Sequence, residues 1–163
     1  MQINLKWKKG LFSNCYSIYS NGQLIGKLND NSFSQSANGE LNGKRYNFKT
    51  KGFIKQKTQI LEASSNKVIG EITFDNWMTK ADITVLNKKA KLKYDNLWNT
   101  KWRIFDSEGL EIKFTGCSNG QIDSNTDDPL LLLSGLFVSN YYMQMTVVVL
   151  VAIFIPIWTS ISF

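Results

Sequence analysis

Apolar and polar residues alternate through most of the first 128 positions of the chain. Ile3, Leu5 and Trp7 are separated by polar residues, and the same period of two returns at Tyr46 and Phe48. Successive side chains of a β-strand point to opposite faces, so this alternation predicts strands that bury one face. A helical period of about 3.6 residues is not found in this part of the chain.

Tight turns are predicted between the alternating runs by Asn-Gly pairs, because both central residues of a type I′ turn need a positive φ. Such pairs occur at 21–22, 38–39, 42–43 and 119–120, and further turns are expected at 65–66, 87–88 and 108–109. About twelve short strands are therefore expected, near residues 2–8, 14–20, 22–28, 33–41, 43–50, 53–63, 67–74, 80–86, 89–95, 100–106, 109–116 and 118–123. This spacing is typical of an all-β sandwich or barrel.

A weak internal repeat has an offset of 44 residues, with Leu24–Leu28 matching Val68–Ile72 and Phe48 falling on Leu92. A genuine repeat implies a sheet that closes by repetition, as barrels and propellers do. Chance similarity among alternating strands is the other explanation. A propeller would have too few blades at this length, so a closed barrel is the expected form.

The end of the chain is different, because no charged residue follows Asp128. Asp128 and Pro129 predict the start of a helix, since Asp is a good N-cap and Pro is tolerated at the first helical position. From Pro129 to Tyr142 the helix would be apolar on every side. Such a helix is buried either in a protein core or in lipid.

Length divides this hydrophobic tail into two parts. Residues 129–143 would span about 22 Å as a helix, which suits a helix threaded through a barrel but is short for a bilayer. Residues 141–161 would span about 31 Å and have Tyr141, Tyr142 and Trp158 near their ends, as membrane spans often do. We therefore expect a barrel domain at 1–143 with a central helix at 129–143, and a possible membrane span within 144–163. One long helix over 129–158, or a tail wholly buried in the sheet, are the alternatives.

The composition adds a charge asymmetry, because all 19 basic and all 13 acidic residues precede the tail and give a formal charge of +6. A basic balance favours anionic partners, although it also serves solubility. The chain has no histidine, which removes the commonest general base and zinc nitrogen ligand. Cys15 and Cys117 stand apart in predicted strands without a CxxC partner, so no metal site is expected. Two buried, reduced thiols are expected, and a disulfide between them is the alternative.

Basic residues on two predicted hairpins are the candidate site for anionic lipid. A lysine near a membrane surface adds about 1 kcal/mol to the binding of anionic lipid. The alternative is that these side chains only solvate the outer face and discourage edge pairing. The candidates are Lys44, Arg45, Lys49, Lys51, Lys88, Lys89, Lys91 and Lys93.

Other chemistry finds little support in the sequence. Trp7 and Trp102 lie between basic residues, a pattern that single-stranded nucleic acid can use, but the alternation turns both rings inward. Nucleic acid is therefore not an expected partner. The sequence has no Gly-rich phosphate loop and no nucleophile elbow, so we expect no enzyme activity, no catalytic residue and no cofactor.

The order of elements, about twelve strands and then the apolar helix from Pro129 to Tyr142, resembles the tubby C-terminal-like fold. That fold includes the tubby, LURP-one-related and phospholipid scramblase-like families, and its twelve-stranded barrel closes around a central apolar helix. The resemblance covers residues 2–143 in the order and number of elements and includes no signature motif. It implies a non-enzymatic, membrane-associated domain, and some relatives bind phosphoinositides, although a shared fold is weak support for a shared function.

The sequence thus predicts an all-β antiparallel barrel of about twelve strands around a central helix, with a hydrophobic tail. The expected function is a non-catalytic, membrane-associated module that binds anionic phospholipid head groups. The alternatives are a soluble binding or scaffold domain with its tail buried in the barrel, and a hydrolase-like or lipid-transferring activity in the barrel lumen. The first residues lack the apolar run of a signal peptide, so the barrel is expected in the cytoplasm, and no protein partner is indicated.

Overall fold

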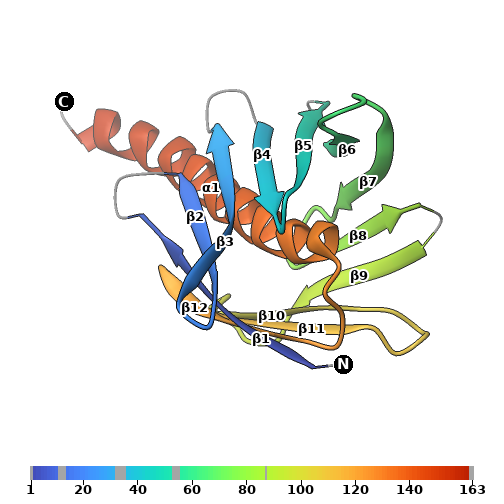
Figure 1. Ribbon diagram of the computed structural model, residues 1–163. Coiled ribbons are helices and arrows are strands. Elements are labelled where there is room, and N and C mark those ends of the chain that lie inside the picture. The colour runs from blue at the N-terminus through green and yellow to red at the C-terminus, as the bar shows by residue number, and fades with distance from the viewer. Residues whose placement is uncertain (1, 11–13, 32–35, 53–55, 87, 162–163) are drawn as a thin grey trace.

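Twelve antiparallel strands form one closed barrel around a long helix (Figure 1). The structure, a computed structural model, describes residues 2–10, 14–31, 36–52, 56–86 and 88–161. Side chains are described as far as residue 156. The strands are β1 (Ile3–Lys9), β2 (Cys15–Ser20), β3 (Gln23–Asn31), β4 (Ser36–Leu41), β5 (Lys44–Lys51), β6 (Lys57–Glu62), β7 (Val68–Phe74), β8 (Lys80–Val85), β9 (Lys88–Tyr94), β10 (Lys101–Phe105), β11 (Glu111–Gly116) and β12 (Asn119–Ser124). The helix is α1 (Pro129–Ile161).

The barrel closes because β1 pairs with β12 as well as with β2, while every other strand pairs with its neighbours in the chain. Closure leaves no unpaired sheet edge. The predicted all-β barrel is confirmed, and each of the twelve predicted runs overlaps one strand, although β3 continues three residues further than predicted. The predicted extensions at 33–35 and 53–55 lie outside the described residues.

The alternating pattern decides which side chains enter the core. Leu5 and Trp7 are buried whereas Lys6 and Lys8 are exposed, and on β5 the buried pair is Tyr46 and Phe48. Removing each such apolar side chain from water contributes roughly 1.5–3 kcal/mol to stability. The barrel interior is therefore apolar, and the lysines lie on the outside.

The weak internal repeat corresponds to a repeated irregularity of the sheet. The pairing of β2 with β3 shifts register between Ile18 and Tyr19, and β6 with β7 shifts between Ile60 and Leu61. In each case one isoleucine of the repeat, Ile25 or Ile69, is the extra residue of a bulge. A β-bulge bends a strand and increases its twist, so both segments contribute the same curvature to the closing barrel.

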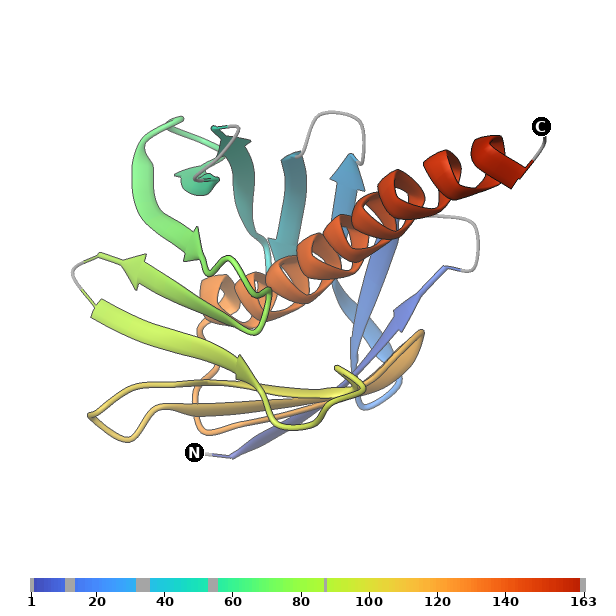
Figure 2. The same cartoon turned by 180° about the vertical axis from the view of Figure 1, so that it is seen from behind.

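The first half of α1 lies inside the barrel and touches strands on different sides of it (Figure 2). Phe137 stacks on Phe48 of β5 with ring centroids 4.7 Å apart. On another side, Trp102 of β10 donates a 3.1 Å hydrogen bond from Nε1 to the carbonyl oxygen of Gly135. The threaded helix completes the apolar core.

The start of α1 is capped as predicted. The Asp128 carboxylate accepts a 2.9 Å hydrogen bond from the Leu130 N–H, which makes Asp128 the N-cap and Pro129 the first helical residue. The helix does not end at residue 143, however. It continues unbroken through Pro156 to Ile161, so the alternative of one long helix describes the backbone better than two separate segments.

Two predicted turns are wrong, and contacts with neighbouring elements explain both. Asn38-Gly39 lies within β4, where a Cβ on Gly39 would stand 3.0 Å from Leu133 of α1. Glycine there permits close packing of helix and strand rather than a turn. Asn119-Gly120 opens β12, so the β11–β12 turn falls at residues 117–118 and the predicted strand position of Cys117 is wrong. Cys15 does lie in a strand. The two thiols are free, but the expected burial of both is wrong, since Cys15 is only partly buried and Cys117 in its turn is exposed.

The other Asn-Gly pairs behave as predicted. Asn21 and Gly22 have φ values of 49° and 82°, and Asn42 and Gly43 have 50° and 77°. Both pairs connect adjacent strands, as a type I′ turn requires. Residue 87 of the predicted 87–88 turn lies outside the described residues.

Candidate functional site

The barrel has two different mouths, because α1 enters at one end and leaves at the other. We call the end near Pro129 the start mouth and the end where Tyr142 leaves the barrel the exit mouth. Successive strands are antiparallel, so odd-numbered strands end at the exit mouth and even-numbered strands begin there. In Figure 1 the red end of α1 projects away from the barrel at the exit mouth.

Burial of the helix stops abruptly at the exit mouth. Tyr142 is only 2% exposed, whereas Met143 is 45% exposed and every residue from 147 to 156 is exposed. We call residues 143–161 the distal helix, which is about 28 Å long. It contains no charged residue. The barrel of a single chain therefore does not enclose this part of the tail.

Polar contacts hold α1 at the point where it leaves the barrel. Asn140 is buried, and its Oδ1 accepts hydrogen bonds from Lys9 Nζ at 2.8 Å and from the Tyr16 hydroxyl at 3.0 Å. One turn further on, Gln144 donates to the Asp30 carboxylate. Burial lowers the pKa of Lys9, and the charge of Asp30 opposes this effect. Hydrogen bonds with side chains of β1, β2 and β3 thus fix this side of the helix to the barrel.

The opposite side of the exit mouth holds α1 in the same way. The Tyr142 hydroxyl donates to Asp75 Oδ1 at 3.1 Å and also to the Lys80 carbonyl oxygen. The Tyr94 hydroxyl lies 3.4 Å from Ser139 Oγ. These contacts fix the position of the helix relative to the turns that follow β7 and β9.

Those two turns carry exposed apolar side chains. Trp77 in the β7–β8 turn is 85% exposed, while Leu97 and Trp98 in the β9–β10 turn are 98% and 86% exposed. Both turns lie at the exit mouth, where Asp75 of the first turn accepts a hydrogen bond from Tyr142. The sequence analysis missed these residues because it looked for interfacial aromatic side chains only at the ends of the hydrophobic tail, and otherwise treated tryptophans as core or as nucleic-acid contacts.

The eight predicted lipid-binding residues are not gathered in one place. The strands that carry them, β5 and β9, are separated in the barrel by β6, β7 and β8, so their outer faces point in different directions. Lys44, Arg45, Lys88 and Lys89 begin these strands and lie toward the start mouth, Lys91 lies midway along β9, and Lys49, Lys51 and Lys93 lie toward the exit mouth.

Several basic side chains on the outer surface are already paired. Arg45 Nε lies 2.9 Å from a Glu40 carboxylate oxygen, and Lys57 Nζ lies 2.9 Å from Glu71. Lys93 Nζ stands 5.6 Å from the centre of the Phe105 ring. These side chains have partners within the barrel and are less available to an external anion.

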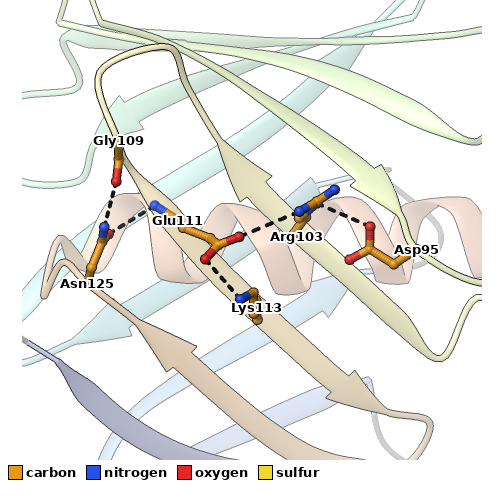
Figure 3. A network of polar contacts seen from close by, with 6 residues as sticks. All are labelled: Asp95, Arg103, Gly109, Glu111, Lys113 and Asn125. Atoms are coloured by element: carbon orange, nitrogen blue, oxygen red, sulfur yellow. Dashed lines mark hydrogen bonds and ion pairs between the residues drawn. The ribbon is translucent and has the colours of Figure 1, made fainter.

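The outer face of β10 and β11 carries a charge network that is balanced within itself (Figure 3). Arg103 Nε lies 3.1 Å from Asp95 without the alignment of a hydrogen bond, and the same guanidinium reaches Glu111 at 3.5 Å. Lys113 approaches Glu111 at 2.9 Å. The hydrogen bond from Lys113, together with both positive charges, lowers the pKa of Glu111.

The two mouths differ in their charged side chains. At the exit mouth Lys51, Lys80 and Lys101 are exposed, and within the described part of the chain no carboxylate pairs with them. The nearby Asp75 is occupied by hydrogen bonds of its own turn. The start mouth carries the acidic residues Asp106, Glu108, Asp127 and Asp128 together with the basic residues Lys44, Arg45, Lys88 and Lys89. The basic side chains nearest to the exposed distal helix are those at the exit mouth.

The described residues contain no cluster of His, Cys, Asp and Glu side chains that could hold a metal ion. An open groove of about 1200 Å³ lies at the start mouth, between the β4–β5 turn and the beginning of α1, and its lining mixes acidic with basic side chains. The helix itself occupies the barrel interior, which leaves the predicted lipid-transferring lumen without support.

Comparison of the chain with protein families, with curated proteins and with solved structures finds no match in any of the three.

Proposed function

We propose that this protein is a non-catalytic β-barrel module held at a membrane by its distal helix, with anionic phospholipid head groups beside the exit mouth. The observation that carries this proposal is the exposed apolar surface of α1 from Val147 to Pro156. Leaving so many large aliphatic side chains in water is costly, at roughly 25 cal/mol for each Å² of apolar surface. A bilayer removes that cost without a further protein partner.

Helix length supports the same proposal. The distal helix is about 28 Å long, close to the roughly 30 Å hydrocarbon thickness of a bilayer. Its backbone hydrogen bonds are made within the helix, as a lipid environment requires. Because it continues without a linker from the buried half of α1, the exit mouth would lie directly on the membrane surface.

The charges specify which head groups would be favoured. Lys51, Lys80 and Lys101 surround the exit mouth, and each adds about 1 kcal/mol to binding when it lies near an anionic surface. Of the residues predicted from sequence, Lys49 and Lys51 remain candidates, whereas Lys93 lies at the same end but its Nζ already stands 5.6 Å from the centre of the Phe105 ring. Lys44, Arg45, Lys88 and Lys89 lie toward the opposite mouth and would face away from the same bilayer.

The basic barrel and the uncharged tail also favour one orientation. Basic segments next to a membrane span are retained on the cytoplasmic side. We therefore place the barrel on the cytoplasmic side in this proposal. The resemblance to the tubby-like families stays a prediction, because a shared arrangement of strands and helix does not identify a family.

Flotation of the full chain on phosphatidylcholine vesicles tests the membrane anchor. The chain is expected to float with the vesicles and to resist extraction by alkaline carbonate. Val149→Lys with Ile153→Lys should abolish flotation, because each lysine at the centre of a span costs about 2.5–3.5 kcal/mol. Val68→Lys with Leu86→Lys is the matched control, since these apolar residues are exposed at the start mouth. A wild-type chain that remains in the soluble fraction would overturn the proposal.

The head-group part needs a separate comparison, with vesicles that contain phosphatidylserine. Replacing Lys51, Lys80 and Lys101 by Gln should reduce the preference for these vesicles while flotation on neutral vesicles persists. Replacing Lys44, Lys88 and Lys89 by Gln removes the same formal charge at the start mouth and should have little effect. If both sets behave alike, the anchor stands but the assignment of the head-group contacts is wrong.

A further inference from the structure

One loop design occurs twice at the exit mouth. The β7–β8 turn reads Asp75-Asn76-Trp77-Met78-Thr79-Lys80, and the β9–β10 turn reads Asn96-Leu97-Trp98-Asn99-Thr100-Lys101. Each has Asp or Asn at the first position, then Trp at the third, Thr at the fifth and Lys at the sixth. We call these segments the twin loops.

The backbone of the twin loops is held by equivalent hydrogen bonds. Asp75 Oδ1 accepts from the backbone N–H of Thr79 at 2.9 Å and of Lys80 at 3.0 Å. The Thr79 hydroxyl donates to the other carboxylate oxygen at 2.9 Å. The Asp75 carbonyl oxygen accepts from the Met78 N–H at 3.3 Å, and Met78 has a φ of 55°.

The second loop repeats this scheme with an amide in place of the carboxylate. Asn96 Oδ1 accepts from the backbone N–H groups of Thr100 and Lys101, both at 3.0 Å, and its Nδ2 donates to Thr100 Oγ1 at 2.7 Å. The Asn96 carbonyl oxygen accepts from the Asn99 N–H at 3.3 Å, and Asn99 also has a φ of 55°. The two loops are therefore structural copies.

The result is a rigid turn that presents a tryptophan outward. Side-chain bonds close each loop from its first residue to its fifth and sixth, so little conformational entropy is left to lose on binding. Trp77 and Trp98 are nevertheless 85% and 86% exposed, and neither supports the core. Large apolar side chains gathered at one exposed place mark an interaction surface.

The position of the twin loops identifies the surface they meet. Asp75 accepts a hydrogen bond from Tyr142, the last buried residue of α1. The first loop is also tied to the end of β9, which leads into the second loop, because the Tyr94 N–H donates to the Thr79 carbonyl oxygen at 3.3 Å. The exposed tryptophans therefore lie beside the point where the apolar distal helix leaves the barrel.

We propose that the twin loops are a membrane-interface anchor, with Trp77, Leu97 and Trp98 inserted at the boundary between head groups and acyl chains. Tryptophan is enriched at this boundary because its ring is apolar while its N–H bonds to water or head groups. Lys80 and Lys101 follow at the base of each loop, at the level of the phosphates. This inference rests on the proposed membrane anchor and adds the surface that contacts lipid.

Such an anchor would determine how the barrel sits on the bilayer. A single helix allows the barrel to rotate about the helix axis and to tilt. Contacts through the β7–β8 and β9–β10 loops would bring the β7–β10 side of the exit mouth down to the membrane. The twin loops would then give the module one orientation.

Site-specific fluorescence of the full chain in vesicles tests this inference. In a Cys15→Ser, Cys117→Ser background, Leu97→Cys carries an environment-sensitive NBD label, and Leu86→Cys is the matched control at the start mouth. Both leucines are exposed, at 98% and 70%. In phosphatidylcholine vesicles with brominated acyl chains, the label at 97 should shift to the blue and be quenched at least about threefold more than the label at 86. Asn76→Cys offers a second position, on the other loop.

The outcomes separate the two proposals. If the chain floats with vesicles and the labels at 76 and 97 are quenched no more than the label at 86, the twin loops do not touch lipid and only this inference falls. If the chain does not float, the membrane anchor and the inference fall together. Trp77→Ala with Trp98→Ala should leave the chain carbonate-resistant but reduce the quenching of a label at residue 97. Unchanged quenching in this double variant would also overturn the role of the tryptophans.

Discussion

Tyr142 and Asp75 join the helix to the barrel at the point where burial ends. The Tyr142 hydroxyl donates a 3.1 Å hydrogen bond to Asp75 Oδ1, and the same carboxylate closes the β7–β8 loop. Tyr142 is 2% exposed, while the next residue, Met143, is 45% exposed. The pair therefore couples the end of the buried helix to the loop that presents Trp77.

Removing this hydroxyl should weaken the junction. Tyr142→Phe is expected to lower the free energy of unfolding by about 1.5–3 kcal/mol, the usual value of a hydrogen bond to a charged group. Tyr141→Phe is the control, because within the described residues no hydrogen bond is made by its hydroxyl, and its ring contacts with Phe74, Phe137 and Tyr142 are kept in the variant. Chemical denaturation in mild detergent measures both changes. In a double-mutant cycle with Asp75→Asn, fully additive effects would show that the two groups are not coupled.

Acid should destabilise the same region. Burial alone would raise the pKa of Asp75, but hydrogen bonds from Lys80, Thr79 and Tyr142 outweigh it and lower the pKa. A carboxylate with a lowered folded-state pKa stabilises the fold above its unfolded-state pKa, and this contribution is lost as the pH falls through the folded-state value. Denaturation curves between about pH 6 and pH 2 should show a smaller loss of stability in Asp75→Asn than in the wild type. Equal losses would mean that other carboxylates account for the acid sensitivity.

A matched pair of leucines should distinguish the two halves of α1. Leu133 is fully buried, so Leu133→Ala should lower the free energy of unfolding by about 2–5 kcal/mol. Leu150 is 47% exposed on the same helix, and Leu150→Ala should change the free energy of unfolding by less than about 0.5 kcal/mol in detergent. Unfolding followed by tryptophan fluorescence measures both. A large effect at Leu150 would mean that the distal helix packs on protein.

The buried Asn140 allows a test of the polar contacts that fix the helix to β1 and β2. Asn140→Leu removes the acceptor for Lys9 and Tyr16, and leaves a half-buried ammonium and a buried hydroxyl without it. Losing the partner of a buried polar group costs about 1–3 kcal/mol. Adding Lys9→Met with Tyr16→Phe to this variant should restore part of the lost stability, which thermal unfolding can follow. If the added substitutions restore no stability, the loss in Asn140→Leu comes from poor packing of the new leucine and not from the missing acceptor.

Local patterns in the chain were enough to predict the strands, the cap and the apolar helix. Alternation identifies the buried face of each strand because side chains along a strand have a period of two, and Asp128-Pro129 carries its own start signal. Glycine was ambiguous. Gly43 supplies a positive φ in a turn, but Gly39 accommodates Leu133 of α1, a contact between residues far apart in the sequence.

Which surface residues lie together, and at which end of the barrel, was decided by the tertiary structure. Two lysine-rich hairpins look equivalent in the sequence, yet the order of strands places β5 and β9 on separate faces, and strand direction divides their lysines between two mouths. Trp77 and Trp98 are unremarkable turn residues until barrel closure brings both loops to the end where the helix emerges. The period of two along a strand indicates which face of that strand a residue occupies. Which end of the barrel it faces depends on the closure of the sheet and on the path of α1.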